Sequence, residues 1–227
     1  MRARYNDSMV LEKEPTLDRD CLLDQQHLVL DDVSWDFYEN VLAVIGDRPL
    51  RVTYHQGRIE IMAPLAMHES GKMHIAALIE VLALELNIPM LCFGSATFRR
   101  SDRQAGLEPD SCYYHKNASR VRGMKRFDPA VHPAPDLAIE VDITSRSIAR
   151  EPIYADLGVP ELWRYDGFRL TVLILNATAK YQASSVSAAF PFLPMDRFDQ
   201  FIHRMDDEER TTVLREFQRW VRTLHRG

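Results

Sequence analysis

The sequence has no apolar run close to the roughly 20 residues that a membrane-spanning helix needs. Its first residues also lack the apolar stretch of a secretory leader. We therefore expect a cytoplasmic protein. Cysteine is scarce, because Cys21, Cys92 and Cys112 are the only three and form no CxxC pair. An odd, scattered set of this kind predicts reduced structural thiols and argues against both a disulfide framework and a zinc site.

Positive charge is in short supply over the whole chain, which has a net charge of −5. That balance argues against indiscriminate binding to polyanions. The charge is nevertheless uneven. Residues 1–40 carry four Lys/Arg against ten Asp/Glu, whereas residues 99–126 carry eight Lys/Arg against three Asp/Glu. The second segment fits two interpretations, a solvated loop or an edge that contacts phosphates, and both stay open at this point.

Length and composition indicate one globular unit. A chain of 227 residues with 46% hydrophobic and 27% charged residues can form one sizeable core but is short for two ordinary domains. The first 30 or so residues are polar and unpatterned. We therefore predict an N-terminal extension over residues 1–33 and a single domain over residues 34–227.

Periodicity and turn signals alternate between helix and strand along the chain. Helical spacing predicts helices at 35–44, 68–86, 148–157, 195–204 and 207–224, with an N-cap at Ser34 for the first and a C-terminal glycine, Gly158, for the third. Short alternating or apolar runs predict strands at 51–55, 58–62, near 90–99, at 110–114, 135–141, 161–165 and 170–175, with a hairpin turn at His55-Gln56-Gly57 between the first two. This order predicts an α/β fold with one mixed β-sheet flanked by helices.

Two carboxylates stand out because they occur where strands begin or end. Asp110 enters one predicted strand and Glu140 lies inside an otherwise apolar one. A carboxylate in an apolar strand is costly to bury unless it is paired or bound to a metal. Hard cations such as Mg²⁺ prefer carboxylate oxygens and keep several waters. We therefore expect a metal between Asp110 and Glu140. Two structural alternatives remain, in which Asp110 anchors a turn and Glu140 pairs with Arg150.

A set of motifs occurs in a fixed order over about half of the chain. The matching stretches are residues 54–62, Pro64, 68–69, 106–110, 135–141 and 154–163. In this order and spacing the chain resembles the Uma2-family endonuclease-like proteins, which belong to the PD-(D/E)XK restriction-endonuclease-like superfamily. The resemblance implies a restriction-endonuclease-like core, hydrolysis of DNA phosphodiester bonds with Mg²⁺ or Mn²⁺, and a homodimer.

The resemblance also implies a role for individual residues. Asp110 and Glu140 fall on the metal-binding carboxylates, and Glu60 falls on a further acidic position that could complete the metal site. His68 falls on a histidine in the first turn of the long helix, where it could touch a phosphate or transfer a proton. Glu60 as a solvated strand residue and His68 as a capping or surface residue are the structural alternatives. Asp136 is expected to orient the end of its strand.

The sequence departs from the nuclease motif at one position. Asp142 stands where the pattern has lysine, and the family often moves that lysine to the next helix, four residues before a tyrosine. Arg150 occupies that second position before Tyr154. Arginine can bind a phosphate through two hydrogen bonds but cannot lose a proton and act as a base. Lys72 is a candidate substitute.

Because of this departure, two other functions stay open. The first is a catalytically weakened nucleic-acid-binding protein of the same fold. The second is an assembly or regulatory protein that uses the acidic N-terminal arm and the helix around Trp220 as contact surfaces.

Overall fold

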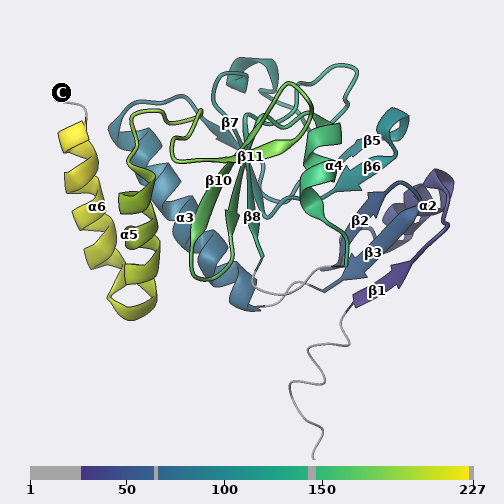
Figure 1. Ribbon diagram of the computed structural model, residues 1–227, viewed down its shortest axis with the longest axis horizontal. Coiled ribbons are helices and arrows are strands. Elements are labelled where there is room, and N and C mark those ends of the chain that lie inside the picture. Colours follow the sequence, from purple (N-terminus) through teal and green to yellow (C-terminus); the bar gives the residue numbers. More distant parts are fainter. Residues whose placement is uncertain (1–26, 64–65, 143–146, 225–227) are drawn as a thin grey trace, which may run out of the picture.

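The strands of this protein divide into two sheets that lie at an angle to one another (Figure 1). The structure is a computed structural model and describes residues 27–63, 66–142 and 147–224. The predicted α/β class with a mixed sheet flanked by helices is confirmed. The division of the strands into two sheets was not predicted. No helix in the described ranges is both long and apolar enough to cross a lipid bilayer.

The smaller sheet has five antiparallel strands in the order β1-β3-β2-β6-β5. Its strands are β1 (His27–Leu30), β2 (Arg51–His55), β3 (Arg58–Met62), β5 (Phe98–Arg100) and β6 (Ala105–Leu107). The predicted hairpin between β2 and β3 is confirmed. Gln56 and Gly57 at its turn both have positive φ, of 49° and 86°, as a type I′ turn requires.

Helix α2 (Trp35–Ile45) packs on the smaller sheet through Tyr38 and begins as predicted at Ser34. The Ser34 hydroxyl accepts a hydrogen bond from the Phe37 amide at 3.1 Å, which satisfies one of the free amides at the helix start. Strand β6 runs directly against this helix. A side chain at Gly106 would collide with the Tyr38 ring, so only glycine fits there.

The larger sheet has six strands in the order β11-β10-β9-β8-β7-β4. They are β4 (Leu91–Cys92), β7 (Ser111–Tyr114), β8 (Leu137–Val141), β9 (Glu161–Tyr165), β10 (Leu170–Leu175) and β11 (Tyr181–Ser184). Among the strands of the described residues, only β8 and β9 pair in parallel. A parallel pair needs a crossover, which α4 (Arg150–Leu157) supplies before it ends at Gly158 in a left-handed conformation.

Helices cover the two faces of the larger sheet unequally. One face carries α3 (Ala66–Glu85), α5 (Met195–Asp207) and α6 (Arg210–Leu224), and the other carries α4 (Figure 1). Side chains of β8 alternate between these faces. Leu137, Ile139 and Val141 belong to the core under α3, α5 and α6, whereas Ala138 belongs to the core under α4. Glu140 therefore lies on the α4 face.

The strand predicted near residues 90–99 is two separate strands. β4 pairs with β7 in the larger sheet, and β5 pairs with β6 in the smaller one. Gly94, between them, has a positive φ of 53° and turns the chain from one sheet to the other. The segment before Asp110 thus connects the two sheets. The predicted extension over residues 1–33 contains β1, and residues 1–26 lie outside the described part of the chain.

Candidate active site

Asp110 and Glu140 lie beside one another at the junction of the two sheets. In the β7–β8 register Ser111 stands opposite Ile139, so the residues one step further along each strand are Asp110 and Glu140. The Asp110 Oδ2 atom accepts a hydrogen bond from the Val141 amide at 2.6 Å. Each of the two carboxylates is only 2% exposed. The structure therefore brings together the two residues that the sequence singles out first.

Tyr154 holds the Glu140 carboxylate from α4. Its hydroxyl donates a hydrogen bond to Glu140 Oε1, and its side chain is fully buried. Burial, followed by the negative charge of Glu140, raises the pKa of Tyr154 well above its usual value. Tyr154 therefore stays protonated and remains a hydrogen-bond donor. Its hydrogen bond fixes Oε1 of Glu140 and, with it, the orientation of the carboxylate.

Arg51 is a member of the site that the sequence analysis missed. Its guanidinium forms an ion pair with Asp110 Oδ1 and crosses from the smaller sheet to the larger one. The β2–β3 register pairs Arg51 with Met62 and Thr53 with Glu60, so Arg51 shares a sheet face with Glu60. That register was available from the predicted hairpin and was the signal that could have found Arg51.

Arg150 is held by Glu60 rather than left open to solvent. Its Nη2 atom donates to Glu60 Oε2 at 2.8 Å, and Glu60 Oε1 accepts from the Ser147 amide at 3.0 Å. Glu60 is 2% exposed and the Arg150 side chain is 9% exposed. The solvated alternative for Glu60 is thereby excluded. The pair joins β3 of the smaller sheet to the first residue of α4.

The site therefore concentrates charges that would be costly to bury singly. Three carboxylates, Glu60, Asp110 and Glu140, are nearly inaccessible, and two guanidiniums, of Arg51 and Arg150, lie among them. Burial of one ion without a partner costs several kcal/mol. Arginines pair with Asp110 and Glu60, and the Tyr154 hydroxyl donates to Glu140. These contacts hold the three carboxylates in place at the junction of the two sheets.

Glu108 lies close enough to Arg51 and Arg150 for their charges to affect its pKa. Burial raises the pKa of its carboxyl group, while a hydrogen bond from Thr97 and the charges of Arg51 and Arg150 oppose that rise. The Thr97 hydroxyl donates to Glu108 Oε1 at 3.0 Å. The acidic cluster at the sheet junction thus includes Glu108, two residues before Asp110 in the sequence.

A small pocket opens beside Glu140 on the α4 side of the sheet. It encloses about 200 Å³, and Glu140, Asp142, Arg150 and Arg164 are among the residues that line it. Arg164 stands opposite Glu140 in the parallel β8–β9 register and pairs with Glu151 at 2.5 Å. The sequence analysis also missed Arg164. Two arginines and three carboxylates, Glu151 being the third, therefore line this pocket, which suits an anionic group that is bound next to a cation.

The residues present fit a hard divalent cation. Asp110 and Glu140 supply only carboxylate oxygens, and Mg²⁺ commonly takes one or two carboxylates and completes its shell with water and phosphate oxygens. Within the described ranges no cluster of three or more His, Cys, Asp or Glu side chains is arranged to hold a metal. A site built from two carboxylates and waters is consistent with both observations. Glu60 already accepts from Ser147 and Arg150, so it has less capacity to act as a third ligand.

Asp136 has a structural role outside this centre. Asp136 accepts hydrogen bonds from the backbone amides of His115 and Asn117, at 2.8 and 3.1 Å, so it orders the turn that follows β7. His68 lies in the first turn of α3, but its side chain is outside the described part of the structure. Its predicted contact with phosphate stays a prediction. Lys72, one turn further along α3, is half-buried.

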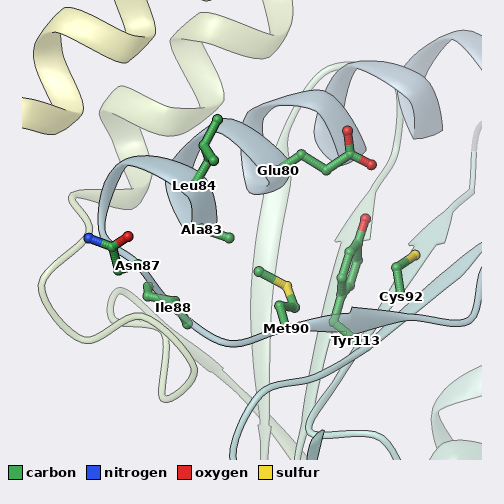
Figure 2. Close-up of a pocket in the computed structure, with 8 residues that line it drawn as sticks. All are labelled: Glu80, Ala83, Leu84, Asn87, Ile88, Met90, Cys92 and Tyr113. Atoms are coloured by element: carbon green, nitrogen blue, oxygen red, sulfur yellow. The ribbon is translucent and has the colours of Figure 1, made fainter. Parts of the chain in front are cut away.

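Another pocket, of about 370 Å³, lies on the opposite face of the larger sheet (Figure 2). Glu80 of α3 and Asn87, which follows the end of that helix, line part of it together with Cys92 and Tyr113. Tyr113 belongs to the core under α3, which places this pocket away from Glu140. None of the predicted site residues lines it.

A solved structure and a family model match this chain. A solved structure described as a "putative nuclease belonging to DUF820" from Anabaena variabilis ATCC 29413 is 16% identical to this chain, with a TM-score of 0.43. The match covers 74% of this chain and 90% of that one. No curated protein matches. The model of the Uma2 family, described as "Putative restriction endonuclease", matches residues 35–201. These residues include the larger sheet, strands β2, β3, β5 and β6 of the smaller sheet and every described residue of the site. The fold is therefore restriction-endonuclease-like, and the chain belongs to the Uma2 family.

Proposed function

We propose that this protein is a divalent-metal-dependent endonuclease that hydrolyses phosphodiester bonds in DNA. The observation that carries the proposal is the pair of buried carboxylates, Asp110 and Glu140, held side by side next to a pocket with two arginines. Membership of a family described as restriction endonucleases supports the same reaction. Phosphodiester hydrolysis requires a cation that neutralises developing charge and positions a water, together with groups that hold the phosphate.

Asp110 and Glu140 are the residues that would bind Mg²⁺ or Mn²⁺, and the bound cation would lower the pKa of a water and stabilise negative charge on the phosphate. The protein's own residues would fix the geometry. Tyr154 orients Glu140, and the Val141 amide and Arg51 orient Asp110. Such preorganisation reduces the cost of reorientation during the reaction.

Arg150 and Arg164 would hold the phosphate at the pocket beside Glu140. Arg150 cannot act as a general base, because a guanidinium keeps its proton. Glu60 keeps the Arg150 side chain in place through the 2.8 Å hydrogen bond. We therefore assign Arg150 to phosphate binding and Glu60 to positioning Arg150, with ligation of a metal by Glu60 as the alternative from family resemblance.

The test is cleavage of plasmid DNA by wild type and variants, paired with calorimetric titration of Mg²⁺ and Mn²⁺. Glu140→Gln keeps the size of the side chain and its hydrogen bond from Tyr154 but removes the charge, so we expect loss of both metal binding and nicking. Arg164→Gln keeps the metal ligands, so we expect normal metal affinity with a raised KM. Equal nicking by wild type and Glu140→Gln would refute the proposal.

One observation favours a second function, nucleic-acid binding without hydrolysis. Asp142 lines the pocket where the nuclease motif has lysine, and Arg150 is already bonded to Glu60. A protein with this function would bind DNA with a strong dependence on salt and would leave the plasmid intact with either metal. The cleavage assay therefore separates the two functions.

A further inference from the structure

A groove runs along α2 at the far edge of the smaller sheet. Two pockets make it up, of about 640 and 430 Å³, and they share Glu39, Arg99, Arg126 and Phe127 in their linings. We refer to these joined pockets as the α2 groove. It is separate from the pocket beside Glu140, with which it shares no lining residue.

One end of the α2 groove reaches the acidic cluster of the candidate active site. Thr97 and Glu108 line this end, and Glu108 lies two residues before Asp110. The charges of Arg51 and Arg150 act on Glu108, which places these groups near one another in space. A ligand that fills the groove would therefore lead toward the carboxylates.

The other end of the groove presents aromatic rings. Trp35, Phe127 and His132 line it, together with Pro129. Trp35 packs against Tyr38 and Tyr54, with ring centroids 5.0 and 5.4 Å apart, yet it stays only half-buried. A ring that is supported on one side and open on the other is a platform for a flat aromatic ligand.

The segment that leads into the groove wall at Lys125 and Arg126 is strongly basic. Residues 111–127 contain five Lys/Arg and no Asp or Glu. These cations, Lys116, Arg120, Arg122, Lys125 and Arg126, are all exposed, and within the described ranges none of them forms an ion pair. Lys125 and Arg126 line the groove itself. Cations without carboxylate partners are available to an external polyanion.

We propose that the α2 groove binds a nucleic-acid strand that carries unpaired bases. Lys125 and Arg126 contact its phosphates, and one base stacks on Trp35. An unpaired base is required because the bases of a duplex already stack on one another and present no free face to a ring. This inference rests on the proposed function for the identity of the polymer, and it specifies a single-stranded or locally opened substrate.

The experiment measures binding of a fluorescent single-stranded oligonucleotide by anisotropy, in EDTA so that no cleavage occurs. Lys125→Gln/Arg126→Gln removes two phosphate contacts, so the slope of log K against log salt should fall by about 1.4. Arg215→Gln/Arg219→Gln is the matched control, because both residues are exposed cations on α6 at the opposite end of the molecule (Figure 1). The control should leave the slope unchanged.

The aromatic contact is tested separately. Trp35→Ala should weaken binding by about 5- to 150-fold, the range measured for removal of one stacking ring. Trp35→Phe keeps a ring and should lose much less. Thermal melting checks that each variant folds. If Trp35→Ala does not fold, His132→Ala removes another ring of the groove without touching the Tyr38 and Tyr54 cluster.

Three results would overturn the inference. The first is that the α6 control loses as much binding as the groove variants. The second is that wild type binds a blunt duplex as tightly as the single strand. The third is that polyglutamate competes as well as nucleic acid, which would identify an acidic peptide as the ligand. Failure of the proposed function looks different. Groove-dependent binding without any cleavage would leave the groove assignment standing and refute hydrolysis. If the protein cleaves nucleic acid but the groove variants bind the oligonucleotide as tightly as wild type, hydrolysis stands and the groove assignment is refuted.

Discussion

The buried pair of Glu60 and Arg150 allows a quantitative test of how the site is held together. Arg150→Met keeps much of the side-chain volume but leaves the Glu60 carboxylate, at 2% exposure, without its guanidinium. Breaking a buried pair from one side typically costs about 3–5 kcal/mol. We therefore expect the free energy of unfolding to fall by about that amount.

The double variant Glu60→Gln/Arg150→Met separates the pair from the individual residues. It removes both charges, so no uncompensated ion remains in the site. Its loss should be smaller than the sum of the two single losses by about 0.5–3 kcal/mol. Urea unfolding followed by circular dichroism gives each value, and an unchanged m-value shows that the unfolded state is comparable.

A matched control comes from the pair of Arg222 and Glu85, in which the arginine is exposed and the glutamate is half-buried. Their side chains are 57% and 13% exposed, and Arg222 Nε lies 2.6 Å from Glu85 Oε2. Exposed pairs contribute about 0–1 kcal/mol, so Arg222→Met should have a small effect. If Arg150→Met costs no more than Arg222→Met, the burial argument for the site is wrong.

Three other predictions concern thiols, pH and assembly. Cys92 is exposed and Cys112 is buried with a raised pKa, so a thiol reagent should label Cys92 in the folded protein and Cys112 only after unfolding, as peptide mapping would show. Burial, with a smaller contribution from Arg210, lowers the pKa of His74 from 6.5 against the opposing charge of Asp206. The unfolded state therefore binds more protons than the folded state near pH 6.5, so the free energy of unfolding should decline as pH falls through that value. In His74→Gln the urea midpoint should fall less with pH than in wild type. Light scattering should give twice the mass of one chain if the predicted homodimer forms; a single-chain mass would contradict it.

Local signals in the sequence were enough to predict much of the fold. The N-cap at Ser34, the turn at Gly57 and the stop at Gly158 each determine nearby backbone geometry through one or two residues, and each was predicted. Strand β6 was missed because it has only three residues and contains Gly106, which a strand pattern disfavours. Its place depends on contact with Tyr38 rather than on its own sequence.

The candidate site was only partly predictable for the same reason. The carboxylates Asp110 and Glu140 stood out because a charge in an apolar strand is unfavourable without a partner. The partners themselves follow from how the two sheets meet. Arg51 lies 59 positions from Asp110, and no periodicity links such residues. The family resemblance supplied Arg150 but not its bond to Glu60.

The distance along the chain between paired residues also determines at which stage of synthesis the site can form. Arg150 follows Glu60 by 90 positions, and Tyr154 follows Glu140 by 14 positions. Synthesis proceeds from the N-terminus, so both sheets begin to emerge from the ribosome before α4 does. A nascent or truncated polypeptide that stops short of residue 147 has the acidic residues but lacks Ser147, Arg150 and Tyr154, which hold Glu60 and Glu140 in position. Under the proposed function, unfinished chains could not cleave DNA, and nuclease activity would appear only once α4 has emerged and packed against the sheets.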